Sequence, residues 1–290
     1  LPPFEGNGRT VRVGLQTGDD FRFVRAWWEV DPSKIVRGMP ETTPDEYRAQ
    51  TFTGKKWVPF TKGGEYSPYY SDVHLLVNWD NDGKELKGFK DPTSGKTYSR
   101  PQNIEYYFRP GLTWPRRSFT LRAAPVPKGC IFSHAGMMAF PLENELYAML
   151  GIFNSLAFDY LSRTKTSSQF EVGIIQTNPL PKEEFLDSPL EGEVVANSKV
   201  IQNFESISEI NSNFCIPFRK MNELRAIIEG ADKYSQEISK NITKYVRLQE
   251  SIDKICYYLY DFSDNDIQQL LTMQLRPSGE MVITEGTFTS

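Results

Sequence analysis

The fold class is decided at Leu142–Thr164, LENELYAMLGIFNSLAFDYLSRT, where the spacing of apolar residues changes along the chain. Apolar side chains in this stretch recur every three or four residues, which places them on one face of a helix. The stretches before it indicate strands and most of those after it indicate helices, so the predicted fold class is α+β. The apolar positions are Leu146, Leu150, Phe153, Ala157, Tyr160 and Leu161.

Upstream of this helix, the sequence predicts a β-rich region of short strands and long loops. Alternating apolar residues, or runs of aromatic and β-branched residues, are typical of strands. Asp80–Arg100 is instead rich in turn residues and is expected to be an exposed excursion. The expected strands are Arg9–Gly18, Phe21–Val30, Lys55–Phe60, His74–Trp79 and the stretches GLTW, FTLRAAPV and CIFSH between residues 111 and 134.

Downstream, FEVGIIQTNPLP (Phe170–Pro181) is expected to be a strand that ends at two prolines. Helices are then predicted at Asn197–Asn211, Met221–Phe262 and Ser263–Gln274. The last of these begins with Ser263 as N-cap and Asp266 three residues later, the spacing of a capping box. The sequence therefore predicts two domains, a β-rich one at 1–185 and a helical, acidic one at 186–290.

Charge is distributed unevenly along the 290 residues, although the net charge is only −4. Residues 55–128 hold 13 Lys and Arg against 7 Asp and Glu, a net charge of +6. Residues 183–290 hold 10 against 18, a net charge of −8. The basic middle segment suggests a region that binds a polyanion, and the acidic end suggests a different task.

Several classes of protein are disfavoured. No apolar run approaches the ~20 residues that cross a bilayer. Three widely spaced cysteines form no disulfide framework and favour a reducing, cytoplasmic setting. Cys130 and His134 lack the second ligand pair that zinc requires, so a buried thiol and a hydrogen-bonded imidazole are expected there. The chain begins without Met, which indicates a processed N-terminus or a segment of a longer protein.

Nucleotide-cofactor and calcium motifs are also missing. TKGGE (Thr61–Glu65) places flexible amides beside a lysine and could approach a phosphate, or it could be a hairpin loop with a solvated lysine. It is not a phosphate-binding Walker loop, and there is no G-x-G-x-x-G. DNDG (Asp80–Gly83) lacks the later ligands of a calcium loop, so a turn is expected.

The stretch GLTWPRRSFTLR (Gly111–Arg122) is the most suggestive motif. Arginine reads guanine through two hydrogen bonds in the major groove and also binds phosphates. On a strand Arg116 and Arg117 would face opposite ways, so one of them is expected to reach a partner. The alternative is a pair of solvated arginines at a strand edge. Trp114 is expected to be a packing anchor.

Taken together, seven stretches in order resemble the target-recognition region of large N6-adenine DNA methyltransferases, of the BREX PglX type and the fused type IIG and IIL restriction–modification enzymes. Residues 148–181 also resemble type I specificity subunits. The matching stretches are GLQTGDDFRFVRAWWEV, KKWVPFTKGGEYSPYYSDVHLLVNWDNDGKELK, NIEYYFRPGLTWPRRS, VPKGCIFSHAGMMAF, LYAMLGIFNSLAFDYL, FEVGIIQTNPLP and IDKICYYLYDFSDNDI.

The resemblance implies a module that recognises a specific sequence in double-stranded DNA, in a restriction–modification or phage-defence system. In that family the catalytic domain lies N-terminal to this region and carries an Asn-Pro-Pro-Tyr/Phe tetrad and an S-adenosylmethionine loop. Neither is present, and TNPLP (Thr177–Pro181) shares only Asn-Pro, so no catalysis, cofactor or metal is expected of this chain alone. S-adenosylmethionine is expected to belong to the absent domain.

Within that expectation, the basic segment would contact DNA, and the acidic helical region would dock on the methyltransferase domain of the same or a partner chain. A protein-binding regulatory or inhibitory module with the same fold is the alternative. The candidate base-reading residues are Arg100, Gln102, Arg116, Arg117 and Arg122, and the candidate phosphate-binding residues are Lys55, Lys56 and Lys62.

Overall fold

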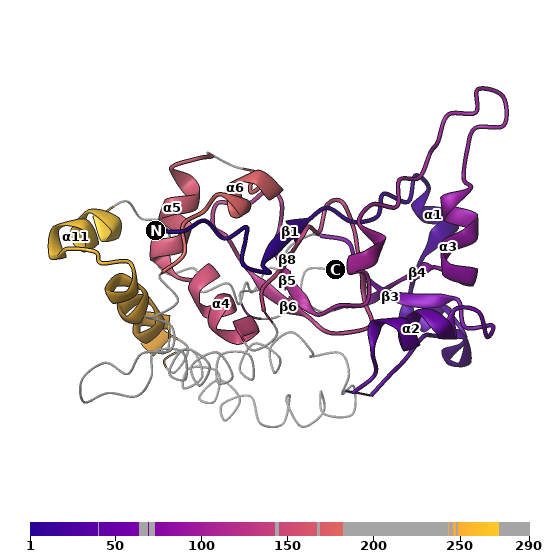
Figure 1. Cartoon of the computed structure of the whole chain (residues 1–290), viewed down its shortest axis with the longest axis horizontal. Helices are drawn as coiled ribbons and strands as arrows, with labels where there is room; N and C mark the ends of the chain where they lie inside the picture. The colour runs from indigo at the N-terminus through magenta and orange to yellow at the C-terminus, as the bar shows by residue number, and fades with distance from the viewer. Residues whose placement is uncertain are drawn as a thin grey trace, which may run out of the picture.

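The computed structural model describes residues 1–39, 41–63, 69, 73–142, 145–166, 169–181, 243, 246–247 and 249–272. Two four-stranded sheets and a set of mostly short helices make up this part of the chain, which confirms the α+β class. In Figure 1 the first sheet lies in the middle, with α4, α5 and α6 on one side of it and the second sheet with α1, α2 and α3 on the other.

The first sheet has the strand order β1 (Thr10–Arg12), β8 (Met138–Phe140), β5 (Gly111–Thr113) and β6 (Ala124–Val126). All neighbours are antiparallel, and Ala139 of β8 lies opposite Val11 on one side and Leu112 on the other. The strands are only three residues long, so side-chain packing on both faces must contribute much of the sheet's stability.

The second sheet has the order β2 (Val24–Ala26), β4 (Leu75–Asn78), β3 (Trp57–Thr61) and β7 (Ile131–Phe132). The pairs β2–β4 and β4–β3 are antiparallel, whereas β3 and β7 run parallel. β3 and β4 confirm the strands expected at Lys55–Phe60 and His74–Trp79. The strand expected at Arg9–Gly18 is shorter, because only Thr10–Arg12 forms a ladder, whereas Leu15 and Gln16 form isolated bridges to Ser133 and Arg100.

The single strand expected at Phe21–Val30 is wrong in part. This region contains α1 (Asp20–Phe23), then β2, then the 3-10 helix η1 (Trp27–Glu29). The Asp19 carboxylate accepts the Arg22 amide 3.1 Å away and so caps α1. Side-chain oxygens of this kind offer the backbone a local alternative to the ladder of a sheet.

Asp80–Arg100 is not turns throughout, which corrects the expectation for its first third. Asp80–Lys87 forms α3, but Asn81, Asp82 and Gly83 have left-handed, non-helical backbone angles, so the turn expected at Asp80–Gly83 is present as a kink and the helical part follows it. Leu86 is fully buried, so α3 belongs to the core. A Cβ on Gly83 would lie 2.6 Å from the Trp79 ring, which explains why glycine occupies this position.

The stretch Leu142–Thr164 is helical as predicted, but it forms two helices, α4 (Leu146–Phe153) and α5 (Leu156–Arg163). Between them, the Ser155 hydroxyl accepts the Phe158 amide at 3.2 Å and caps α5. The Asn154 side chain exchanges two hydrogen bonds of 3.0 Å with the backbone of Ala123. These two polar residues therefore end one helix and begin the next.

The strand expected at Phe170–Pro181 is wrong, since Val172–Gln176 forms the helix α6. A short apolar run cannot be assigned to helix or strand from periodicity alone. Ile175 is fully buried in α6, and Asn178 and Leu180 hydrogen-bond the backbone of Phe4 and Pro2 around an isolated bridge between Pro3 and Pro179.

Near the C-terminus, residues 249–259 are helical and are followed by α11 (Asp264–Thr272). The predicted capping box is confirmed: Ser263 and Asp266 hydrogen-bond each other's amides at 3.0 and 3.3 Å. The helix expected at Asn197–Asn211 and the boundary at 185/186 lie outside the described residues. The remaining short helices are α2 (Pro44–Gln50), η2 (Pro32–Lys34) and η3 (Ile104–Tyr106).

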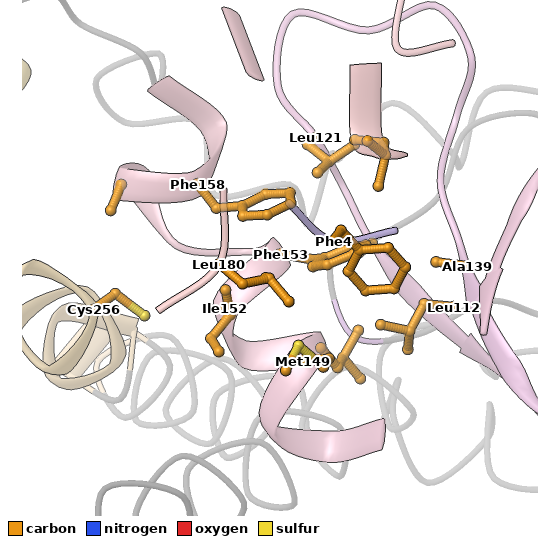
Figure 2. Close-up of a cluster of buried hydrophobic side chains, with 14 of the residues drawn as sticks. Phe4, Leu112, Leu121, Ala139, Met149, Ile152, Phe153, Phe158, Leu180 and Cys256 are labelled. Carbon is orange, nitrogen blue, oxygen red and sulfur yellow. The ribbon is translucent and has the colours of Figure 1, made fainter. Parts of the chain in front are cut away.

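Two hydrophobic clusters lie on the two faces of the first sheet. Val11, Leu112 and Ala139 face the helices, in a cluster that also contains Phe153 and Phe158. Figure 2 shows this cluster, with Phe4 beside Phe153 and with Cys256 entering from the 249–259 helix. Met138, Phe140 and Val126 belong instead to the cluster of the second sheet. Alternate residues of β8 thus serve opposite cores.

Candidate nucleic-acid interface

Trp114 holds the GLTWPRR stretch against the helical side of the molecule, as expected of a packing anchor. Its indole is fully buried, and its Nε1–H donates to the Phe170 carbonyl at 2.8 Å. Two residues further along, the Arg116 carbonyl accepts the Phe170 amide at 2.9 Å. The backbone that presents Arg116 and Arg117 is therefore fixed on the segment that leads into α6.

Arg116 and Arg117 have different environments, as their alternation along the chain predicts. The Arg116 guanidinium binds the Glu171 carboxylate, with Nε and Nη2 at 2.8 and 2.6 Å from Oε1. Arg117 forms a backbone bridge with Gln169, and its exposed side chain contacts no hydrogen-bonding or charged partner among the described residues. Arg117 is therefore the more available of the two for a partner.

Arg122 is half-buried and donates from Nε to the Thr120 hydroxyl at 3.3 Å. Between Arg117 and Arg122, Phe119 is 81% exposed. The stretch Arg117–Arg122 therefore carries an exposed aromatic ring between two arginines along the chain, and aromatic and cationic residues together are common on surfaces that bind nucleic acids.

Arg100 and Gln102 lie at a second place, beside the segment Gly14–Gly18. Arg100 and Gln16 exchange backbone hydrogen bonds of 2.8 and 3.1 Å. The Gln102 side chain reaches the Gly14 carbonyl at 3.5 Å, at the limit of a hydrogen bond. The Arg100 side chain is exposed and forms no hydrogen bond or ion pair within the described ranges.

Lys62 lies on the other side of the same segment and forms an ion pair with Asp20, so it is not a simply solvated lysine. Burial alone would raise the pKa of Asp20, but hydrogen bonds from Lys62 and Thr17 and the lysine charge outweigh burial and lower that pKa. Both side chains line a cavity of about 200 Å³ together with Thr17, Gly18 and His134.

His134 corrects the expectation of a hydrogen-bonded imidazole, because its Nδ1 atom is buried without a partner among the described residues. The other half of that expectation is confirmed: Cys130 is buried, and burial raises its thiol pKa to about 12.

The cavity beside Lys62 could not be predicted from the sequence, because the residues that line it come from three distant segments. No cluster of three metal-ligating side chains occurs in the described part of the chain.

Lys55 and Lys56 are both partly engaged by their neighbours. The Lys55 ammonium donates to the Gln50 side chain at 2.9 Å. The Lys56 ammonium lies 5.5 Å from the centre of the Trp57 ring, within the range of a cation–π contact. These contacts hold the two lysines near β3.

The eight candidate residues thus fall into two groups. Lys55, Lys56, Lys62, Arg100 and Gln102 lie on the lobe of the second sheet, and Arg116, Arg117 and Arg122 lie beside α5 and α6. Figure 1 shows the first sheet between these regions. No helix in the described part of the structure has the length and apolarity needed to cross a membrane.

No known family profile matches the chain. It is 24% identical over 264 residues to the adenine-specific methyltransferase PglX of Lacticaseibacillus casei (strain Zhang), a match that covers 88% of this chain and 21% of that protein. It is 26% identical over 186 residues to the adenine-specific methyltransferase BrxX of Escherichia coli O9:H4 (strain HS), covering 62% of this chain and 15% of that protein.

Among solved structures, the type IIL restriction–modification enzyme MmeI in complex with DNA has a similar fold, with a TM-score of 0.53 and 14% identity. The similarity covers 95% of this chain and 36% of the MmeI chain. The chain thus spans about a fifth or less of the two methyltransferases that it matches. It is homologous, over that limited part of their length, to adenine-specific methyltransferases of the PglX and BrxX kind, and it shares its fold with part of MmeI.

Proposed function

We propose that this chain is the region that recognises a specific double-stranded DNA sequence in an N6-adenine methyltransferase of a restriction–modification or BREX-type phage-defence system. The observation that carries the proposal is the presentation of Arg100 and Arg117. Both side chains are exposed, neither has a side-chain partner among the described residues, and both stand on backbone fixed by bridges to Gln16 and Gln169.

Such a presentation suits the reading of bases. An arginine on fixed backbone loses only side-chain freedom when it forms two hydrogen bonds to guanine, and without a partner it has no ion pair to break first. Arg116 is less suited to that task because Glu171 already binds it. Lys55 and Lys56 at the second sheet would contribute sequence-independent affinity through phosphates, and Lys62 would do so on leaving its ion pair with Asp20.

The relatives support the class of system. Two adenine-specific methyltransferases are homologous to this chain, and the similar MmeI structure was solved with DNA. In our proposal the methyl transfer and the S-adenosylmethionine site belong to a methyltransferase domain outside these residues, in the same or a partner chain. The setting would be the cytoplasm, where such a system meets DNA.

The test begins with binding of the chain to a library of random DNA duplexes, followed by sequencing of the bound fraction and by titration of the selected duplex. Arg117→Ala should weaken binding to the selected duplex by roughly 1–3 kcal/mol and relax the preference at one base pair. Arg100→Ala should act in the same way at a different base pair.

The matched control is Arg247→Ala, since Arg247 is also exposed but lies in the acidic helical region. It should change neither affinity nor sequence preference. Absence of any selected sequence, or unchanged preference in both Arg100→Ala and Arg117→Ala, would contradict the proposal. Capture of a protein without DNA binding would favour the regulatory alternative.

A further inference from the structure

A hairpin at residues 90–97 projects from the lobe of the second sheet. Lys90 and Thr97 form an antiparallel bridge, and the Asp91 amide donates to the Lys96 carbonyl at 2.8 Å. The turn closes at Gly95, whose φ of +67° is readily adopted by glycine. Figure 1 shows the hairpin as the loop that extends beyond α1 and α3 at one end of the molecule.

The turn is stabilised by hydrogen bonds to a single carboxylate, that of Asp91. Asp91 accepts hydrogen bonds from the Thr93 and Ser94 amides at 2.9 and 2.6 Å and from the Tyr98 hydroxyl. These three donors hold both arms of the hairpin to one side chain. The hairpin is therefore ordered before any partner arrives, which lowers the entropy lost on binding.

The base of the hairpin is anchored in the lobe. Phe89 packs against Tyr98 and Phe23, with ring centres 5.2 and 5.1 Å apart, and the Arg22 guanidinium lies over the Phe89 ring at 5.0 Å. A Cβ on Gly18 would lie 2.6 Å from the Tyr98 carbonyl, so the backbone passes in direct contact there. The projection thus moves with the lobe and not as a loose loop.

Positive charge on the hairpin exceeds negative charge. Nearby, Arg22 is paired with Glu85 and Lys87 with Asp82. Lys90 and Lys96 are exposed and have no ion-pair partner among the described residues. With Arg100 directly after the hairpin, three cations stand against the single carboxylate of Asp91.

We propose that the 90–97 hairpin is a phosphate-binding clamp, in which Lys90 and Lys96 contact the backbone of duplex DNA and set the register for Arg100 at its base. This inference rests on the proposed function and adds residues to it. The hairpin tip, Asp-Pro-Thr-Ser-Gly, is small and polar, and so lacks the large aromatic side chains on which protein interfaces depend. Backbone phosphates need only cations held at a fixed spacing.

The experiment compares the whole chain with its Lys90→Ala/Lys96→Ala variant by anisotropy of a fluorescent duplex of mixed sequence, from low to moderate salt. Loss of two phosphate contacts should make the slope of log K against log salt shallower by about 1.8. When salt rises from 50 to 200 mM, the fold-decrease in affinity should therefore be roughly 12 times smaller for the variant than for the wild type. Lys90→Arg/Lys96→Arg should keep the wild-type slope.

The control, Arg247→Ala/Lys254→Ala, removes two exposed cations of the acidic helical region and the same formal charge. An equal loss of slope in this control would show a general charge effect and overturn the hairpin assignment. An unchanged slope in Lys90→Ala/Lys96→Ala would overturn it while leaving the proposed function intact. If the wild-type chain binds no duplex at any salt, the proposed function itself fails, and the inference fails with it.

Discussion

At the scale of single residues, Trp114 shows how one side chain can serve both packing and presentation. It fills the cluster around Phe153 and uses its only donor on the Phe170 carbonyl. Burial of this ring was predictable from the residue type, because tryptophan is highly buried on average. Its hydrogen-bond partner was not, since Phe170 is 56 residues away.

Trp114→Phe should therefore lower the free energy of unfolding by about 1–3 kcal/mol, because it leaves a buried carbonyl without its donor. Urea denaturation followed by circular dichroism measures this change. Phe119→Leu is the control, since Phe119 is 81% exposed, and its effect should stay within about 0.5 kcal/mol. Equal stabilities of the Trp114 variant and the wild type would show that the indole hydrogen bond contributes nothing.

The difference between Arg116 and Arg117 is also a residue-scale result. The alternation of a strand predicts that the two side chains face opposite ways. It does not predict that Glu171 binds one of them. The carboxylate that engages Arg116 comes from the segment expected to be a strand, which is instead the start of α6. An ion pair between two half-exposed side chains adds little stability, about 0–1 kcal/mol, so its consequence is the choice of which arginine stays available.

At the scale of elements, helices were predicted best where their ends carry local signals. The Ser263 and Asp266 capping box marks the start of α11 in the sequence and in the structure. Asn154 and Ser155 carry comparable signals in the middle of the expected long helix, but their meaning depends on Ala123, which only the fold brings to them. The hairpin at 90–97 was expected only as turns, because its anchoring by Phe23 is a long-range contact.

The hairpin makes a prediction about pH. Hydrogen bonds from Tyr98 and from the Ser94 and Thr93 amides lower the pKa of Asp91 from 3.8 to about 2. Because the pKa of Asp91 is depressed in the folded state, its hydrogen bonds stabilise the hairpin fully above pH ~4, and this stabilisation is lost as the pH falls through about 2. An NMR titration of the Asp91 carboxyl carbon should show a midpoint near 2.

Tyr98→Phe removes the largest contribution and should move that midpoint upward toward 3.8. Asp266 offers an internal comparison, since its pKa is also lowered, chiefly by Ser263, and should not respond to the Tyr98 change. A midpoint of Asp91 that stays in place in Tyr98→Phe would mean that the hydroxyl does not fasten the hairpin.

At the scale of the whole molecule, the described part of the acidic region shares a core with the β-rich region. Ile252, Cys256 and Leu259 belong to the same cluster as Phe153 and Leu112. The contact is also polar: the Asp253 carboxylate accepts the Leu156 amide at 2.8 Å, at the N-terminus of α5, where negative charge is stabilised. The predicted boundary at 185/186 remains a prediction, because it lies outside the described residues.

Ile252→Ala should accordingly destabilise the whole described unit by about 2–5 kcal/mol, because it opens a cavity at a fully buried position. Tyr258→Ala, on the same helix but 56% exposed, should change stability by no more than about 0.5 kcal/mol. Far-UV circular dichroism and tryptophan fluorescence should shift together in denaturant. A separate early transition seen by circular dichroism alone would show that the 249–259 helix unfolds by itself.

The alternation of β8 between the two clusters has a consequence for how this chain reaches its native state. If β8 shifted by one residue against β1 and β5, Met138 and Phe140 would point toward the helices and Ala139 toward the second sheet. The packing of both hydrophobic clusters would then be disrupted together. Three-residue ladders contain too few hydrogen bonds to prevent such a slip by themselves. Side-chain packing in the two hydrophobic clusters therefore selects the register of β8.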